Sequence, residues 1–307
     1  MELFPKDEEK LFVVFVIELA KQYYMEYRSY FTKTRLQKLI CLIADKINYE
    51  DFTRGWYRFG YYTPNLEFIE IENLSEVSFD NETVREAFDL YGEHEDIVKN
   101  TLAELREYFI QPHDRFLRWI YDQNEEYAEF YHAKTDFTKM LQRISENLRE
   151  AFTFEIPYER LESSITRLDK SLKHIENVDV LNAYYKLTDL IERIELKLKL
   201  GKTVVEPNAS QILENLLELY NKTILSGMVP YVQTLRGKKA ELERIRYEKR
   251  VMEDIKTANI MLKKFYNDAS EKNLLPSLED YVSEIKELHS HLSPEERERL
   301  SSLLKKS

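Results

Sequence analysis

Apolar residues recur at helical spacing through most of this chain. Between residues 7 and 29 they fall three and four positions apart, which predicts one amphipathic helix. Its apolar positions are Phe12, Phe15, Val16, Leu19 and Tyr23. A second helix is predicted after Thr32 or Thr34, either of which suits the N-terminal capping position. Its apolar face consists of Leu36, Leu39, Ile40 and Ile43, so the two helices are expected to pack together.

The pattern changes after Asp51, where large and polar residues alternate from Phe52 to Phe59. This alternation, ending at Gly60 and Pro64, predicts a strand followed by a turn. Residues 67–79 fit either a return strand or a short helix. Asp80 or Asn81 is then expected to cap a helix that ends at Gly92.

Almost all of the chain after residue 94 is predicted to be helical. Pro112 favours a helix start, and two later segments repeat apolar residues in threes and fours. The first segment contains Leu161, Ile165, Leu168, Leu172 and Ile175, and the second contains Val180, Tyr184, Leu187, Ile191, Ile194 and Leu198. The repeat breaks across Asn177 to Asp179, which predicts a kink or tight turn between two helices packed as in a coiled coil.

Further helices are predicted around Leu213 to Ile224 and onward to about Asp268. Ser293 and Pro294 then mark a last helix start, with acidic residues in its first turn. Composition supports a helical fold, because 6 Gly and 8 Pro in 307 residues leave few of the residues that turns and sheets need.

The length allows one large domain or two smaller ones, and we expect two. The first would span residues 1–110 and the second residues 111–307. Cys41 is the single cysteine and lies on a predicted apolar face, which excludes an internal disulfide or a cysteine-rich zinc site. The expected role of Cys41 is that of a small core residue.

Several features of the sequence favour a cytoplasmic protein that does not enter a membrane. The early apolar run from Leu11 to Ala20 is about half the length that spans a bilayer. Acidic residues precede this run, where a signal peptide would be positive. Abundant Lys and Glu with 21 Tyr is also a composition associated with thermophiles.

Charge is distributed unevenly along the chain. The net charge of −11 argues against a protein that coats nucleic acid with its whole surface. From Arg28 to Arg58, however, seven basic residues face three acids, so that this segment carries a local charge of about +4.

The same segment resembles the winged-helix-like module of Panacea-type antitoxin domains and related uncharacterised microbial and archaeal proteins. Leu36-Gln37-Lys38-Leu39-Ile40 is similar to an LQKLLY-like helix, and Trp56 to Pro64, reading WYRFGYYTP, is similar to a YxYGPYSP-like turn. Tyr61 stands where that pattern usually has Pro, and Thr63 where it has Ser. The resemblance implies a winged-helix-like fold for the first part of the chain and is limited to that part.

A winged helix binds DNA with one helix in the major groove and a basic hairpin on phosphate or in the minor groove. On this interpretation Arg35, Lys38, Arg54 and Arg58 would contact nucleic acid. In the alternative, the aromatic residues form a core, the charges face solvent, and the module mediates protein contacts.

A second basic cluster, residues 236–250, carries seven basic residues and three glutamates. Within it Lys238, Lys239 and Arg246 are candidate nucleic-acid contacts. Glutamates three and four residues from the basic side chains could instead pair with them, which would make this a helix surface stabilised by ion pairs.

The sequence offers little that points to catalysis. It has no GxGxxG, GxxxxGK[ST], GxSxG or HExxH motif, and we expect no cofactor. His94 with Asp96, His113 with Asp114, and His289 with His291 are incomplete as metal sites, which ranks a hydrolase third.

Together these patterns predict a mainly α protein with a winged-helix-like N-terminal domain, a small β-hairpin, and a helical domain with coiled-coil-like hairpins. The expected function is non-enzymatic DNA binding or transcription regulation, and the alternative is an antitoxin-like or scaffolding module that binds a protein partner. The expected partners are therefore duplex DNA or another protein, and the helical domain is expected to form a homodimer.

Overall fold

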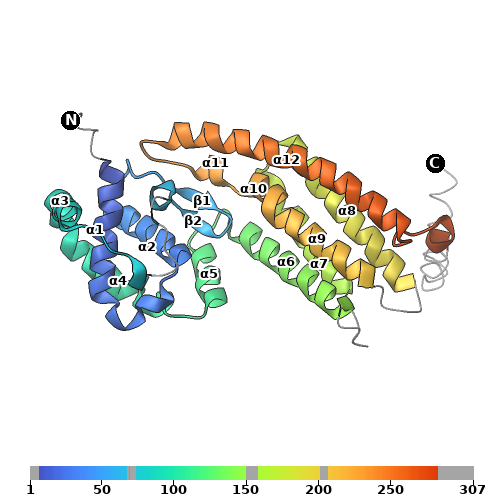
Figure 1. The fold of residues 1–307 in the computed structure, drawn as a ribbon, viewed down its shortest axis with the longest axis horizontal. Coiled ribbons are helices and arrows are strands. Elements are labelled where there is room, and N and C mark those ends of the chain that lie inside the picture. Colours follow the sequence, from blue (N-terminus) through green and yellow to red (C-terminus); the bar gives the residue numbers. More distant parts are fainter. Residues whose placement is uncertain (1–6, 68, 70–73, 150–157, 201–206, 283–307) are drawn as a thin grey trace, which may run out of the picture. The chain divides into compact units, whose positions relative to one another are not determined.

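A computed structural model shows a mainly α protein with one small β-hairpin, as the sequence predicts (Figure 1). The structure describes residues 7–67, 69, 74–149, 158–200 and 207–282. The expected helix start at Ser293 and the histidines at 289 and 291 lie outside these residues. No helix in the described part is long and apolar enough to cross a bilayer.

Contacts divide the chain into two compact units. The first contains residues 1–135, 171–176 and 225–254, and the second contains residues 136–170, 177–224 and 255–307. The first unit therefore includes residues 225–254, which were expected from the sequence to belong to the C-terminal helical domain.

The core of the first unit is built around helix α1. Its first five helices in chain order are α1 (Glu8–Tyr23), α2 (Lys33–Lys46), α3 (Asn81–Tyr91), α4 (Glu95–Phe109) and α5 (His113–Asp122). Phe12 and Phe15 of α1 are fully buried and contact the rings of Phe52, Phe88 and Tyr91 edge-on. The helix predicted over residues 7–29 ends at Tyr23, and a 3-10 turn over Met25–Tyr30 continues it.

Local signals place the next elements where the sequence predicts them. The Asp80 side chain accepts a hydrogen bond from the backbone N–H of Thr83 at 2.8 Å, which caps α3, and Gly92 ends that helix. Pro112 directly precedes α5. Within residues 67–79, the described residues Leu74–Glu76 form a short 3-10 turn.

The hairpin consists of β1 (Gly55–Tyr57) and β2 (Gly60–Tyr62), paired antiparallel with Trp56 opposite Tyr61. Its turn is held by helix α6 (Ala128–Arg149). The Tyr131 hydroxyl donates to the Tyr57 carbonyl at 2.6 Å, and the Lys134 ammonium donates to the Arg58 carbonyl. Residues on α6 thus satisfy the turn carbonyls of a hairpin far away in the sequence.

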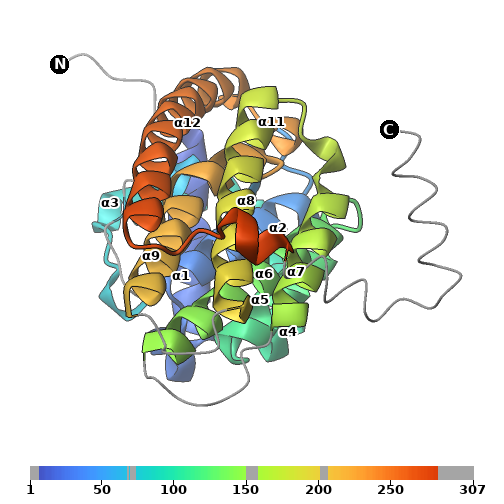
Figure 2. The ribbon, with the colours of Figure 1, turned by 90° about the vertical axis from the view of Figure 1, so that its right-hand side faces the viewer.

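The second unit is a helical bundle (Figure 2). It contains the later part of α6 together with α7 (Tyr158–Ser171), α8 (Val178–Leu200) and α9 (Pro207–Leu219), and a π-helical turn over Tyr220–Ile224 extends α9. The heptad positions predicted from Leu161 to Leu168 and from Val180 to Ile194 are all buried. Tyr184 on α8 donates a hydrogen bond to Asp169 on α7 at 2.7 Å.

The predicted break between the two heptad segments is confirmed. The Asn177 side chain accepts hydrogen bonds from the backbone N–H groups of Asp179 at 3.0 Å and Val180 at 3.2 Å, so it caps α8. Two short helices, α10 (Leu225–Met228) and α11 (Tyr231–Thr234), then precede the long helix α12 (Ala240–Glu271), where a long helix to about Asp268 was predicted.

Candidate functional site

Arg35 on α2 caps the C-terminal end of helix α4. Its guanidinium donates to the Phe109 carbonyl and, at 2.6 Å, to the Gln111 carbonyl, and it lies 4.9 Å from the centre of the Phe116 ring. The last carbonyls of a helix have no partner within the helix and carry the negative end of its dipole, so a buried cation stabilises them. The side chain is 4% exposed.

Lys38 lies one turn further along α2 and is also buried, at 2% exposure. Burial lowers the pKa of Lys38 to about 7. Lys134 shares this property, because burial and the charges of Lys38 and Arg58 lower its pKa to about 7. Three aromatic rings surround the Lys134 ammonium, at 5.1 Å for Phe59, 5.4 Å for Tyr131 and 5.6 Å for Tyr121.

Arg54 precedes β1 and is 3% exposed. It pairs with Asp45 at the C-terminal end of α2, at 2.6 Å, and donates to the Tyr49 and Phe52 carbonyls at 2.8 and 2.7 Å. Asp45 also pairs with Arg236 and accepts a hydrogen bond from the Tyr61 hydroxyl at 2.7 Å. Asp45 therefore joins helix α2, the hairpin and the segment before α12 through three polar partners.

The other predicted contact residues are more accessible than these three. Arg58 is half-buried with its guanidinium 5.4 Å from the centre of the Tyr57 ring. Lys238 is exposed, and its backbone N–H donates to the Asp51 carbonyl at 2.8 Å. Arg246 is exposed and pairs with Glu243 at 2.9 Å, as the ion-pair alternative for this helix expects.

Burial separates the first three predicted residues from any nucleic acid. Arg35 and Arg54 use their charge inside the first unit, on carbonyls, a carboxylate and an aromatic ring, and the Lys38 amine is buried in the same unit. A phosphate contact needs a cation that reaches solvent, so that counterions are released on binding. These three side chains do not reach solvent. The basic helix of the sequence is thus an internal feature of the fold.

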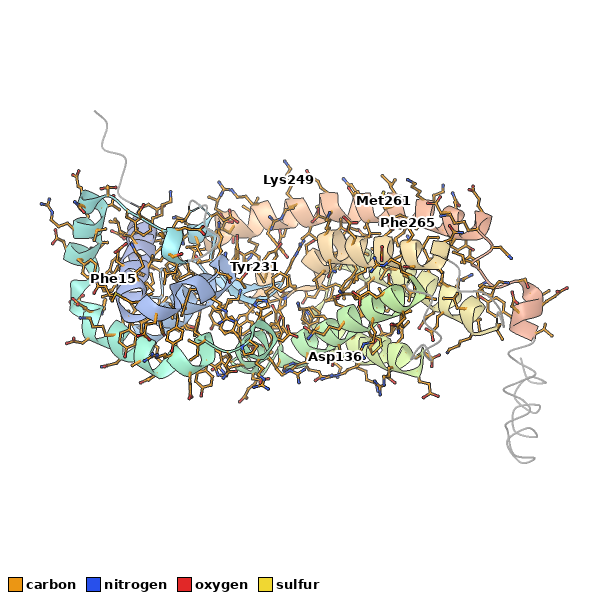
Figure 3. All side chains as sticks on the ribbon, turned by 60° about the horizontal axis from the view of Figure 1, so that its bottom comes forward. Phe15, Asp136, Tyr231, Lys249, Met261 and Phe265 are labelled. Atoms are coloured by element: carbon orange, nitrogen blue, oxygen red, sulfur yellow. The ribbon has the colours of Figure 1, made fainter. Side chains whose placement is uncertain are left out.

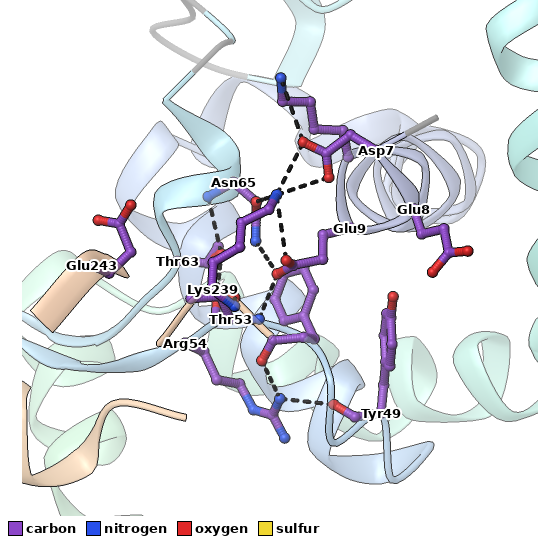
Figure 4. Close-up of polar contacts among 12 residues, drawn as sticks. Asp7, Glu8, Glu9, Tyr49, Thr53, Arg54, Thr63, Asn65, Lys239 and Glu243 are labelled. Carbon is purple, nitrogen blue, oxygen red and sulfur yellow. Dashed lines mark hydrogen bonds and ion pairs between the residues drawn. The ribbon is translucent and has the colours of Figure 1, made fainter. Parts of the chain in front are cut away.

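Lys239 belongs to a buried polar network centred on Glu9 of α1 (Figure 4). Glu9 accepts hydrogen bonds from the backbone N–H of Thr53 at 2.6 Å and from the Asn65 amide at 2.5 Å. The Lys239 ammonium lies 3.3 Å from the other Glu9 oxygen, 2.8 Å from Asp7 and 3.1 Å from the Asn65 side-chain oxygen. Although partial burial raises the pKa of Asp7, the hydrogen bond and charge of Lys239 outweigh it, and the net shift is downward.

Backbone pairing holds Lys239 in place. Arg54 and Arg236 exchange two backbone hydrogen bonds, of 3.0 and 2.9 Å, in an isolated antiparallel bridge. Gly237 follows with φ +107°, and a Cβ atom there would lie 2.5 Å from the Thr53 backbone. The Thr53 hydroxyl then accepts the backbone N–H of Lys239 at 3.0 Å. We call residues 236–239, together with their partners at 51–54, the clasp.

The clasp has the chemistry of a structural network. Arg54 and Arg236 pair with Asp45, and Lys239 pairs with Asp7 and Glu9, so these buried and half-buried charges stabilise the fold. Burial raises the pKa of the Cys41 thiol to about 12, so it stays protonated and unreactive. Among the described residues, no three His, Cys, Asp or Glu side chains come together as a metal site.

Sequence patterns could not have identified this network. Glu9 stands in an acidic run before an apolar helix, and Lys239 in a basic cluster more than two hundred residues later. Neither position breaks a periodicity, and their pairing depends on the path of the chain between them.

The second feature is an exposed face of α12 that is partly apolar. Leu242, Ile245, Met252 and Ile260 are 49%, 58%, 57% and 71% exposed. They lie away from the buried face of the helix, which contains Tyr247, Val251, Ile255, Leu262 and Phe265. Exposed lysines lie among them at positions 249, 256 and 263. Figure 3 shows Lys249 pointing away from the body of the protein. We call these seven residues the α12 stripe.

Comparison with known proteins gives a family without an assigned activity. The model of a domain of unknown function, DUF8098, matches residues 70–297. The chain belongs to this family. The match includes Lys239 and the whole α12 stripe, but it begins after α1, α2 and the hairpin that the clasp holds. No curated protein and no solved structure matches the chain.

Proposed function

We propose that this chain is a non-enzymatic protein-interaction module that binds a protein partner through the α12 stripe. The observation that carries the proposal is the exposure of four large apolar side chains along one helix. Single exposed apolar residues are ordinary on protein surfaces, but several on one face mark an interaction site. A helix whose other face is already buried has this second face available for a partner.

The predicted DNA binding has less support than the predicted protein interaction. The burial of Arg35, Lys38 and Arg54 removes three of the seven residues on which DNA binding would depend. Binding to duplex DNA stays a prediction that rests on Arg58, Lys238, Lys239 and Arg246. Lys239 is already paired with Asp7 and Glu9, and Arg246 with Glu243. The Panacea-like resemblance of the first helices, the homodimer and the cytoplasmic location likewise stay predictions.

The test is retention of a protein by the tagged chain after nuclease treatment. We expect a retained protein that is lost when Leu242→Ser, Ile245→Ser and Met252→Ser are combined. A matched control combines Leu90→Ser, Ile97→Ser and Leu278→Ser, which alter apolar side chains of 45%, 45% and 79% exposure elsewhere. Equal retention by both variants, or no retained protein, would refute the proposal.

A gel-shift assay at low salt distinguishes DNA binding from protein binding. Specific or non-specific binding to duplex DNA that weakens with salt, and with Lys238→Ala and Arg246→Ala, would support the alternative. Retention of protein without any such shift is the outcome that the interaction module predicts.

A further inference from the structure

The α12 stripe has the spacing of a coiled-coil seam. Leu242, Lys249, Lys256 and Lys263 follow one another at intervals of seven. Ile245 and Met252 come three residues after Leu242 and Lys249. These are the a and d positions of a heptad repeat, whose side chains lie on one side of a helix and face a partner helix.

The register continues less regularly toward the end of the helix. Asn259 holds the next d position, where its side-chain oxygen accepts a hydrogen bond from Lys186 at 2.8 Å. Ile260, directly beside it, is the most exposed apolar residue of the stripe. Helix α12 is uninterrupted from Ala240 to Glu271, so the seam from Leu242 to Lys263 is about 30 Å long at 1.5 Å per residue.

The three lysines indicate what kind of helix fits this seam. Lys249, Lys256 and Lys263 are exposed and make no hydrogen bond or ion pair with any residue that the structure describes. Two neighbouring cations of α12 are paired, Arg244 with Glu241 and Arg246 with Glu243. Three unpaired positive charges in the seam favour a partner with carboxylates at the facing positions.

We infer that the α12 stripe binds an acidic amphipathic helix of another protein as a two-stranded coiled coil, with Asp or Glu of the partner facing Lys249, Lys256 and Lys263. This inference rests on the proposed function and specifies its partner. A second copy of the chain fits less well, because in a parallel pair each of these lysines would face its own counterpart.

Two synthetic peptides test the inference. Both contain four heptads with Leu at every d position; one has Glu and the other Lys at every a position, and all other residues are the same. Binding of each labelled peptide to the full chain is measured by fluorescence anisotropy. We expect micromolar affinity for the Glu peptide, at least about tenfold weaker binding of the Lys peptide, and a smaller difference at high salt.

Charge-reversal variants of the chain provide a second test. Combining Lys249→Glu, Lys256→Glu and Lys263→Glu should invert the preference, so that the Lys peptide binds more tightly. Lys170→Glu, Lys173→Glu and Lys238→Glu make the same charge change at exposed lysines outside the stripe and should leave the preference for the Glu peptide. Circular dichroism checks that each variant is folded. The comparison of the two peptides on the unaltered chain does not depend on the folding of any variant.

The outcomes separate this inference from the proposed function. Equal binding of the two peptides, or binding of neither, overturns the inference that the partner is an acidic helix. The proposed function survives that result if the Leu242, Ile245 and Met252 variant still loses its retained protein. A dimeric mass by light scattering that the stripe variants reduce to a monomer would identify a second copy as the occupant and overturn the inference.

Discussion

Lys239 places its ammonium nitrogen 3.3 Å from a carboxylate oxygen of Glu9, whose side chain is 3% exposed. The two residues lie more than two hundred positions apart in the sequence. The segment that carries Lys239 is fixed by backbone hydrogen bonds between Arg236 and Arg54 and by the Lys239 N–H, which donates to the Thr53 hydroxyl. The pair thereby makes the start of α12 part of the same unit as α1 and the hairpin.

Replacing Lys239 with Met should destabilise the protein by about 1–3 kcal/mol, because it leaves the buried Glu9 carboxylate without a counter-charge. The effect is measured by urea unfolding at pH 7. Lys238→Met is the matched control, since the Lys238 side chain is exposed, and its effect should stay within about 0.5 kcal/mol. Equal effects of the two substitutions would show that the Glu9 pair does not stabilise the clasp.

Gly237→Ala should destabilise the protein by about 2–4 kcal/mol, since the positive φ strains an L-residue and the new Cβ would meet the Thr53 backbone. Gly92→Ala is the control, because no heavy atom lies within 4 Å of its Cβ position and its φ is −60°. The control should be neutral or stabilising by up to about 1 kcal/mol. Thermal unfolding of both variants measures the difference, and a tolerated Gly237→Ala would contradict the described clasp.

Lys38→Met should stabilise the protein at pH 6 by about 1–3 kcal/mol. The folded-state pKa of about 7 lies below the ordinary 10.5, so the unfolded chain holds the proton more tightly. The charged lysine therefore costs most below pH 7, and the gain should disappear as the pH approaches 10.5. Urea unfolding across this range measures it.

Lys46→Met on the same helix is the control for Lys38. Its side chain is more than half exposed in a surface pair with Glu104, and the substitution should change stability by no more than about 0.5 kcal/mol at pH 6. A pH-independent gain from Lys38→Met would mean that the buried amine is not the titrating group.

Glu195→Gln in the second unit should stabilise the protein by about 1 kcal/mol at pH 8. Burial raises the pKa of Glu195 to about 7, although Lys199 lies 2.9 Å from the carboxylate. The folded state thus binds the proton more tightly than the unfolded chain, whose ordinary value is 4.5. The cost of the ionised form is present above pH 7 and absent below pH 4.5, so the gain should vanish in acid.

Glu218→Gln serves as the control for Glu195, because its carboxylate is 58% exposed in a surface pair with Lys222. Its effect should stay within about 0.5 kcal/mol from pH 4.5 to pH 8. Unfolding curves at both pH values decide the matter, and a gain from Glu195→Gln that persists at pH 4.5 would contradict the assigned titration.

The elements with strong local signals were predictable from the sequence. Asp80 caps α3, Pro112 precedes α5, and Asn177 separates α7 from α8, because each of these residues satisfies backbone groups only a few positions away. The heptad segments likewise bury the side chains that their spacing selects, except for the half-buried Leu198. Periodicity and capping depend on near neighbours, and near neighbours are visible in the sequence.

The candidate site was less predictable, for a reason that Arg35 illustrates. A basic residue on an amphipathic helix is ordinarily exposed, yet Arg35 is buried because the carbonyls at the end of α4 and the Phe116 ring supply partners for its charge. The exposure of Met252 and Ile260 is the converse case, since apolar residues of α12 at similar spacing are buried on its other face.

The sequence by itself determined the mainly helical class, the position of the hairpin and most helix boundaries. Only the tertiary structure decided that Arg35, Lys38 and Arg54 are internal, that Lys239 completes a buried carboxylate network, and that α12 leaves a lysine-containing apolar face to solvent. The physical reason is that helix formation is governed by bonds and contacts within a few residues. Whether a charge is buried or an apolar side chain exposed depends on partners that the sequence places far away.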